Sequence, residues 1–375
     1  MSKNVENILS DLIAIRTDAQ EKGCQECVDY ICDILQKNDI LFKRVVSTDG
    51  RIENVIAGIN VHEFKNIRTG LVFSGHIDTV GVNSKDWDTN PFVATNINGL
   101  IYGRGTVDMK FFPAVLLSMI NELKQMDYPI FLLFTADEET TVDGIRTLTS
   151  FMQMRNIRPK FALLGEPTNF DLCVANKGYC GFSTIIKGLS AHSSRPDCGV
   201  NAIYVGAQII AEIEKINNEY MSLGTTLNVG VVTGGVQRNS IPSEASFDWE
   251  IRFSDEKHKV DIMERIEELH RKLINSREHL YIRILERENL PVFSRMYDSR
   301  IVNVAKNILS TNIITLPLAT EAGFLQKLGI DTLICGAGDE KLAHSSSEHI
   351  KVTDLHKYRN FLLKFICEMQ KEFKV

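Results

Sequence analysis

The sequence predicts an α/β fold in which a mixed sheet flanked by helices is interrupted by an inserted α+β domain. Short apolar runs rich in β-forming residues alternate with helical patterns over residues 1–174, and this alternation resumes after residue 289. The segment between them, residues 175–288, has the ferredoxin-like order strand–helix–strand–strand–helix–strand. We therefore expect one domain built from residues 1–174 and 289–375, and a second domain inserted at residues 175–288.

In the first segment, the spacing of the apolar residues predicts each element. Helical patterns occur near residues 3–15 and 20–38, and again over residues 109–126. Pro113 falls in the first turn of the third helix, where its missing N–H costs little. Runs of β-forming residues bounded by turn residues predict strands near residues 41–46, 53–59, 70–76 and 129–135.

The inserted segment has its own succession of elements. The stretch GYCGFSTIIKG alternates like a half-buried strand, and residues 199–218 have a helical pattern. TTLNVGVVTGG and SEASFDWEIRF are typical of two paired strands. A helix over residues 256–274 and a strand over residues 280–285 complete a domain of about 110 residues, a usual domain size.

Composition and charge narrow the class of protein. A hydrophobic content of 44% with 24% charged residues is ordinary for a soluble globular chain, and 375 residues suffice for two domains. The net charge of −6 argues against a nucleic-acid-binding protein, which needs a basic patch, and no apolar run reaches membrane-spanning length. The N-terminus does not have the pattern of a signal peptide, so we expect a cytoplasmic protein.

The eight cysteines are then expected to be reduced thiols. Cys24-x-x-Cys27 has a spacing that can bind zinc or form a redox pair. It lies in a predicted helix, however, without a second pair to complete a four-ligand site. We therefore interpret these two residues as ordinary helix cysteines.

The candidate metal-binding and catalytic residues lie at the ends of the predicted strands. The run LVFSGHIDTV contains His76 and Asp78 at its end, and alternate residues of a strand share one face. An imidazole suits a borderline metal ion, and a neighbouring carboxylate fixes its tautomer. Alone, the pair is weak evidence, because buried histidines often hydrogen-bond an aspartate for structural reasons.

Further acidic groups and one more histidine follow other strand-like runs. In open α/β sheets, ligands gather outside the carboxyl ends of the strands, so these side chains are expected in one crevice. Together they exceed what one zinc ion needs. They are Asp108 in YGRGTVDMKFF, Asp137, Glu138 and Glu139 after PIFLLFT, Glu166 in FALLGEPT and His344 in GAGDEKLAHSSSE.

These motifs, in this order, resemble the dinuclear zinc amidohydrolases and peptidases, a superfamily that includes aminoacylase, succinyl-diaminopimelate desuccinylase and carboxypeptidase G. Within it, the chain is most similar to the acetylornithine deacetylases. The resemblance covers nearly the whole chain and implies a zinc-peptidase-like catalytic domain with an inserted dimerisation and lid domain. It is carried by GHIDTV, GRGTVDMK, TADEE, LGEPT, KGYCGF, AHSSRPDCGVNAI, TTLNVGVVTGG, NSIP and TEAGFLQKLGI.

The resemblance implies two divalent metal ions per subunit, zinc in the first place, with cobalt or manganese as ions that the same donors accept. Five side chains would hold them: His76 and Glu166 for one metal, Glu139 and His344 for the other, and Asp108 as the bridge. Glu138 would be the general base, and Asp78 would orient His76. Neighbouring residues on an extended backbone point in opposite directions, so Glu138 and Glu139 are expected to have different roles.

A mechanism follows from this implied site. Two metals roughly 3.5–4 Å apart can hold a bridging water and lower its pKa from 15.7 to about 7, which supplies hydroxide at neutral pH. Glu138 would take the proton and return it to the leaving amine. The oxyanion also needs a donor, and the resemblance implies that this is His192, reaching across from the partner subunit of a homodimer.

The remaining candidates concern the substrate. Asn239 and Arg252 match family residues that hold it, and an arginine fork suits a carboxylate. Glu321 is our candidate for recognising a side-chain ammonium. The plain alternatives are an ordinary loop histidine for His192 and a solvated surface charge for Arg252. Asp137 is expected to be structural.

Two departures from the family pattern bear on substrate identity. Phe111 and Phe112 follow DMK, where the family usually has glycine. Ser345-Ser346-Ser347-Glu348 follows His344, where a proline-containing acidic segment is common. Neither departure replaces a residue that the resemblance makes a metal ligand.

The expected function is hydrolysis of the small molecule N2-acetyl-L-ornithine to L-ornithine and acetate, in arginine biosynthesis. No nucleic-acid or membrane partner is expected. The first alternative is the same chemistry on N-acetylcitrulline, N-succinyl-diaminopimelate or a dipeptide. A second alternative is an inactive amino-acid-binding homologue, against which the complete ligand set and Glu138 argue.

Overall fold

The chain forms two compact units in a computed structural model that describes residues 4–18, 23–294 and 299–373. Unit 1 comprises Met1–Ala175, Ser294–Thr315 and Glu321–Val375. Unit 2 comprises Asn176–Phe293 and Leu316–Thr320. None of the described helices is long and apolar enough to cross a membrane.

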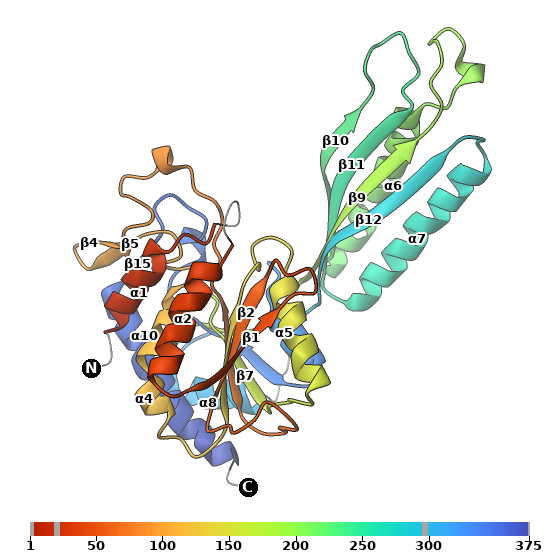
Figure 1. The fold of residues 1–375 in the computed structure, drawn as a ribbon. Helices are drawn as coiled ribbons and strands as arrows, with labels where there is room; N and C mark the ends of the chain where they lie inside the picture. Colours follow the sequence, from red (N-terminus) through yellow and green to blue (C-terminus); the bar gives the residue numbers. More distant parts are fainter. Residues whose placement is uncertain (1–3, 19–22, 295–298, 374–375) are drawn as a thin grey trace. The chain divides into compact units, whose positions relative to one another are not determined.

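Unit 1 is built on an eight-stranded mixed sheet, seen edge-on near the centre of Figure 1. Strand β3 runs parallel to β6 and β7, and β7 runs parallel to β14, whereas β1, β2 and β6 pair in antiparallel fashion. Every residue of β3, β6 and β7 is buried, which explains their continuous apolar sequences. In spatial order the strands are β1 (Leu41–Val46), β2 (Glu53–Ile59), β6 (Ile130–Thr135), β3 (Leu71–His76), β7 (Phe161–Leu164), β14 (Asp331–Ile334), β8 (Leu172–Asn176) and β13 (Ile313–Leu316).

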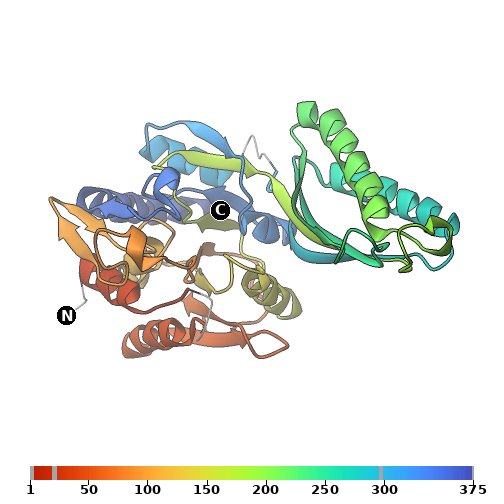
Figure 2. The same cartoon turned by 90° about the horizontal axis from the view of Figure 1, so that it is seen from above.

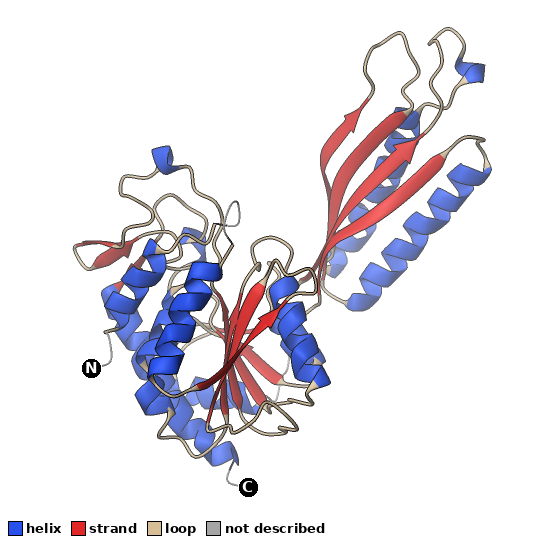
Figure 3. Cartoon of the chain, in the orientation of Figure 1, coloured by secondary structure: helices blue, strands red, loops and turns tan. Residues whose placement is uncertain are grey.

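Helices cover this sheet, with α2 and α5 on opposite sides of it (Figure 3). The prediction of a mixed sheet flanked by helices is therefore confirmed. A separate three-stranded sheet has the order β15-β5-β4 and joins His349–Lys351 (β15) to Leu100–Tyr102 (β5) and Thr95–Ile97 (β4). The helices are α1 (Val5–Ala14), α2 (Gln25–Lys37), α3 (Phe111–Ser118), α4 (Ile120–Leu123), α5 (Asp143–Met154), α8 (Arg300–Ile308), α9 (Ala322–Lys327) and α10 (Val352–Met369).

Unit 2 is a four-stranded antiparallel sheet with two helices on one face (Figure 2). The sheet order is β10-β11-β9-β12, so the first strand lies between the third and the fourth, as in a ferredoxin-like fold. Alternate residues of β11 are buried against the helices, which explains the alternating sequence. In chain order the elements are β9 (Gly178–Lys187), α6 (Ala202–Tyr220), β10 (Thr226–Gly234), β11 (Glu244–Phe253), α7 (Glu256–Asn275) and β12 (Tyr281–Leu290).

Most predicted elements occur within a few residues of their expected bounds. The predicted helix over residues 109–126 is instead divided into α3 and α4 at Met119, whose N–H bonds to the carbonyl of Leu116 rather than continuing the α-helical ladder. The expected start of the second helix, residues 20–22, lies outside the described residues. Strands β4, β5, β8, β13 and β15 were not predicted, because three to five residues carry too little periodicity.

The ring of Phe112 fills the space beneath the ends of β3 and β7. Phe111 and Phe112 are both fully buried. A Cβ on Gly75 would lie 2.8 Å from Cδ1 of Phe112, and a Cβ on Gly165 would overlap the same ring. These glycines directly precede His76 and Glu166. The Phe112 ring is therefore accommodated by the absence of side chains at both strand ends.

This packing makes Gly165 intolerant of even one added methyl group. We expect Gly165→Ala to lower the free energy of unfolding by about 1–3 kcal/mol, because overpacking forces the Phe112 ring or the strand end to move. Shortening the ring in the double variant Gly165→Ala/Phe112→Leu should cost less than the sum of the two single changes. Urea denaturation of the four proteins measures both quantities.

Gly81→Ala is the matched control, because a Cβ there meets no heavy atom within 4 Å and its φ is not positive. Its stability should equal or slightly exceed that of the unchanged protein. Equal stability of Gly165→Ala and the unchanged protein would contradict the close contact with Phe112.

Candidate metal centre

Three parallel strands deliver acidic and imidazole groups to one edge of the sheet in unit 1. Strand β3 ends at His76, β6 ends three residues before Glu138, and β7 ends two residues before Glu166. Because these strands are parallel, their carboxyl ends lie at the same edge. The loop before α3 brings Asp108 to this edge, and the segment after β14 brings His344.

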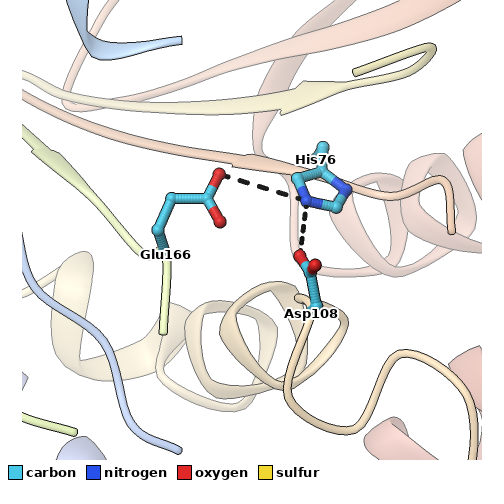
Figure 4. Close-up of side chains that lie close together, drawn as sticks. All are labelled: His76, Asp108 and Glu166. Carbon is cyan, nitrogen blue, oxygen red and sulfur yellow. Dashed lines mark hydrogen bonds and ion pairs between the residues drawn. The ribbon is translucent and has the colours of Figure 1, made fainter. Parts of the chain in front are cut away.

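Asp108 lies between the two histidines. Its Oδ1 is 2.9 Å from Nε2 of His76, and its Oδ2 is 3.1 Å from Nε2 of His344. Oε1 of Glu166 approaches Nε2 of His76 from another side, at 4.0 Å (Figure 4). Each oxygen of one carboxylate thus faces a different imidazole, which is the arrangement needed for a carboxylate shared by two metal ions.

Three overlapping groups of donor atoms result, with the atoms of each group within 4.8 Å of one another. Imidazole nitrogen and carboxylate oxygen are donors that zinc, cobalt and manganese accept. Among the described residues, no cysteine joins such a group. The groups are His76, Asp108 and Glu166; Asp108, Glu139 and His344; and His76, Glu138 and Glu139.

The charges of these residues are strongly coupled. Burial opposes a charge on His76, but the hydrogen bond and charge of Asp108, with the charges of Glu166 and Glu138, hold its pKa well above the usual value. Hydrogen bonds to Asp108 and Glu139 raise the pKa of His344 to about 10. Burial works against the ionised form of Asp108, yet hydrogen bonds from both histidines keep its pKa below the usual range. Both histidines thus hold a proton more strongly than a free imidazole does.

The environment of the other carboxylates disfavours their ionised forms. Burial raises the pKa of Glu166 to about 8, and the like charges of Asp108, Glu321 and Glu139 add to this. Burial also raises the pKa of Glu138 well above its usual value. Nearby divalent cations would offset this repulsion, so the electrostatics of the donor set fit metal ions as well as the chemistry of the donors does.

Asp78 contacts His76 through its backbone and its side chain. Nδ1 of His76 donates to the carbonyl oxygen of Asp78 at 3.0 Å, and the carboxylate Oδ1 is 3.6 Å from the same nitrogen. The other carboxylate oxygen accepts the N–H of Glu139 at 3.0 Å. Asp78 therefore holds the ring of His76 through its backbone carbonyl and the backbone of Glu139 through its carboxylate.

The expectation of an extended backbone at Glu138 and Glu139 is wrong. Strand β6 ends at Thr135, and residues 138–141 form a turn. Asp137 adopts a positive φ of 70°, and its carboxylate accepts hydrogen bonds from the hydroxyls of Thr140 and Thr141. These contacts agree with the structural role expected for Asp137.

Oε1 of Glu139 reaches Nε2 of His344 at 3.1 Å.

Glu321 lies among the same charges, at the start of α9. It is fully buried, and its Oε2 accepts a hydrogen bond of 3.0 Å from the hydroxyl of Thr135. Its Oε1 has no hydrogen-bond partner among the described residues. Burial raises the pKa of Glu321 to about 7.

Sequence reasoning missed the contribution of Glu348. This residue is fully buried, and its carboxylate accepts the N–H of Asp108 at 3.1 Å and pairs with Arg104 at 2.6 Å. The only signal in the sequence was an acidic residue four positions after His344, which is too common to identify a role.

The remaining candidates belong to unit 2. Nδ1 of the exposed His192 lies 2.8 Å from the hydroxyl of Ser194, and the carbonyl of Asn239 accepts the N–H of Ser193 at 3.1 Å, so these two loops touch. Nε of Arg252 donates to Glu250 at 2.9 Å, and the guanidinium lies 5.0 Å from the ring centre of Tyr179. The structure therefore brings His192 and Asn239 together within unit 2, and gives Arg252 an ion pair.

The described cysteines include Cys24 at the N-cap of α2 and Cys27 in its first turn. All eight are free thiols, as expected. Burial raises the pKa of both Cys24 and Cys27, which makes them poor nucleophiles.

Comparisons with known proteins agree with this arrangement. Residues 72–368 match the model of a protein family described as "Peptidase family M20/M25/M40". Acetylornithine deacetylase from Buchnera aphidicola subsp. Acyrthosiphon pisum (strain APS) is 31% identical over 312 residues, which cover 79% of this chain and 80% of that protein. The acetylornithine deacetylase of Pasteurella multocida (strain Pm70) is 32% identical over 311 residues, with 79% and 80% covered.

Solved structures share the fold. An M20 family metallo-carboxypeptidase from Sulfolobus solfataricus superposes with a TM-score of 0.78 at 19% identity, over 98% of this chain and all (100%) of that one. A dinuclear metal binding peptidase of family M20 from Bacillus subtilis superposes with a TM-score of 0.68 at 14% identity, over 98% of each chain. The family match over most of the chain, together with these relatives, shows that the protein belongs to peptidase family M20/M25/M40, a family of hydrolases.

Proposed function

We propose that this protein is a two-metal deacylase that hydrolyses N2-acetyl-L-ornithine to L-ornithine and acetate, in the cytoplasm and as a step of arginine biosynthesis. The observation that carries the proposal is Asp108, whose two oxygens face His76 and His344 at 2.9 and 3.1 Å. Two relatives about one-third identical bear the name acetylornithine deacetylase, which supports the choice of substrate.

In this proposal, His76 and Glu166 hold one ion, Glu139 and His344 hold the other, and Asp108 is shared. Zinc is the first candidate, and cobalt and manganese are acceptable to the same donors. When bound, such ions supply Lewis acidity and a water of lowered pKa. The family resemblance and the three donor groups around Asp108 support this assignment.

Glu138 is the proposed general base. It would take a proton from the attacking water as the oxygen adds to the acetyl carbon, and would deliver that proton to the leaving amine nitrogen as the amide bond breaks. His192 would donate a hydrogen bond to the carbonyl oxygen as negative charge develops there.

The charge of unit 1 favours a cationic substrate. Six carboxylates interact around His76 and Asp108, and the buried Lys110 is a cation that interacts with Asp78. Two divalent ions and one lysine leave a surplus of negative charge. A side-chain ammonium would be attracted by this surplus, whereas the second carboxylate of a succinyl group would be repelled. Glu321, whose Oε1 accepts no hydrogen bond from the residues that the structure describes, is the proposed partner of that ammonium.

Unit 2 is proposed to serve dimerisation and closure over the substrate, with His192 acting on the partner subunit's substrate and with Asn239 and Arg252 holding the substrate. This part of the proposal rests on the resemblance. A monomer in sedimentation experiments that retains full activity would contradict it.

The affinity for metal should rise with pH. The pKa of His344 is about 10 and that of Glu166 about 8 in the metal-free protein, so both groups carry protons at pH 7 that an incoming ion must displace. Affinity should increase by up to about tenfold per pH unit between pH 7 and 8 for each displaced proton. Calorimetric titration of the apoprotein with zinc, in buffers of different ionisation enthalpy, measures the protons released.

The His344→Gln variant should release about one proton fewer when it binds zinc, because the glutamine amide has no proton that titrates in this pH range. Metal binding that is independent of pH in the unchanged protein would contradict the proposed role of His344.

Glu138→Gln should lower kcat by about 10²- to 10⁴-fold, because the amide cannot accept the proton of the attacking water. The variant should still bind two metal ions per subunit, as measured by metal analysis. Asp137→Asn is the neighbouring control, since the Asp137 carboxylate accepts hydrogen bonds from the hydroxyls of Thr140 and Thr141 in its turn. Turnover by Glu138→Gln equal to that of Asp137→Asn would remove Glu138 from the mechanism.

The side-chain ammonium should govern substrate choice. N-acetylornithine should exceed N-acetylnorleucine, which has a methyl group in place of the ammonium, by at least about tenfold in kcat/KM, or about 1.4 kcal/mol. N-acetylcitrulline, N-succinyl-diaminopimelate and dipeptides complete the panel. Glu321→Gln should reduce the ratio most. Thr135→Val should reduce it less, because losing this hydrogen bond raises the pKa of Glu321 but leaves its carboxyl group in place. A ratio near one in the unchanged protein would exclude ammonium recognition.

A further inference from the structure

The carboxylate of Glu348 accepts four hydrogen bonds from a single loop. Oε2 accepts Nη1 of Arg104 at 2.6 Å and the N–H of Gly105 at 3.1 Å. Oε1 accepts the N–H of Val107 at 2.8 Å and that of Asp108 at 3.1 Å. The residue is 0% exposed, so both oxygens are fully occupied in holding residues 104–108. A buried charge bonded in this way fixes the backbone that it contacts.

Strand pairing delivers Glu348 to this loop. In the three-stranded sheet, His349 of β15 pairs with Tyr102 of β5. The carbonyl of Glu348 then accepts the N–H of Gly103 at 3.2 Å, so the two segments remain in contact beyond the strands. Gly105 has a φ of 89°, and a Cβ on it would lie 2.9 Å from Cδ of Lys110, so the loop has little freedom to adopt another path.

Arg104 extends the connection to His344. Its Nη2 donates to the carbonyl oxygen of His344 at 3.3 Å, and its guanidinium lies 5.3 Å from the ring centre of Trp87. Arg104 is 4% exposed. The buried pair of Arg104 and Glu348 therefore joins the loop that carries Asp108 to the segment that carries His344.

We propose that Glu348 is a positioning residue which, with Arg104, fixes the separation of Asp108 and His344 and thereby the affinity of one of the two metal positions. This inference rests on the proposed two-metal function. The position concerned is formed by Asp108, Glu139 and His344. His76 and Glu166 instead follow strands β3 and β7 of the eight-stranded sheet, and Asp78 rather than Glu348 holds the His76 ring.

The experiment is a calorimetric titration of metal-depleted protein with cobalt chloride, in which two binding steps are resolved. Glu348→Gln keeps the size of the side chain but places an amide N–H₂ where an acceptor is needed. We expect one binding step to stay within about threefold of the unchanged protein and the other to lose about 10- to 100-fold in affinity. Its kcat should be low at limiting cobalt and should recover when cobalt is raised.

Arg104→Met is a second variant that tests the same connection should Glu348→Gln fold poorly, and it should weaken the same step. Asp171→Asn is the matched control: its carboxylate accepts a hydrogen bond of 3.1 Å from the N–H of Asn312 in the same unit, away from the donor groups. Asp171→Asn should leave both binding steps unchanged.

The outcomes separate the inference from the proposed function. Selective weakening of one step supports the inference, whereas unchanged steps in both variants, or equal weakening of both steps, overturn it. Failure of the unchanged protein to bind two ions would count against the proposed function itself.

Discussion

The carboxylate of Asp108, with one oxygen directed at each of two histidines, is the interaction on which the arrangement of unit 1 depends. His76 ends a central strand, whereas His344 follows the last parallel strand of the sheet. A single carboxylate can face both only if the loop before α3 holds it at a fixed position between them. Two sets of contacts help to fix the position of this loop. Phe112 packs against the strand ends, and Glu348 accepts a hydrogen bond from the loop backbone. The position of Asp108 therefore depends on both packing and hydrogen bonding.

Buried negative charge explains why this arrangement needs cations. Burial raises the pKa of Glu166, Glu138 and Glu321, so each would bind protons more readily than in water. The same carboxylates raise the pKa of both histidines and so favour their cationic forms, which reduces the repulsion in the metal-free protein. A divalent ion relieves more of it and leaves the imidazoles neutral, as ligands must be. Bound cations would thus stabilise the folded acidic cluster. As pH rises, metal ions would compete more successfully with protons for these side chains.

The sequence predicted the parts of the site that are set by strand direction. His76 and Glu166 follow buried apolar runs, and parallel strands bring their carboxyl ends together, so their proximity could be expected. Two features could not be read from the sequence. The turn after β6 depends on Asp137 at positive φ, which a continuous DEE run does not indicate. The role of Glu348 depends on the pairing of two three-residue strands distant in sequence, and neither strand has a detectable period.

The Arg104–Glu348 pair also bears on why a departure from the family pattern can be harmless near a metal site. The three serines that follow His344 differ from the usual proline-containing segment, but the geometry is imposed from outside this stretch. Arg104 holds the carbonyl of His344 at its start, and β15 holds His349 just beyond its end. Residues between two fixed points can vary as long as their number spans the distance. Changes in the serines should therefore affect what approaches His344 from solvent more than how His344 meets Asp108.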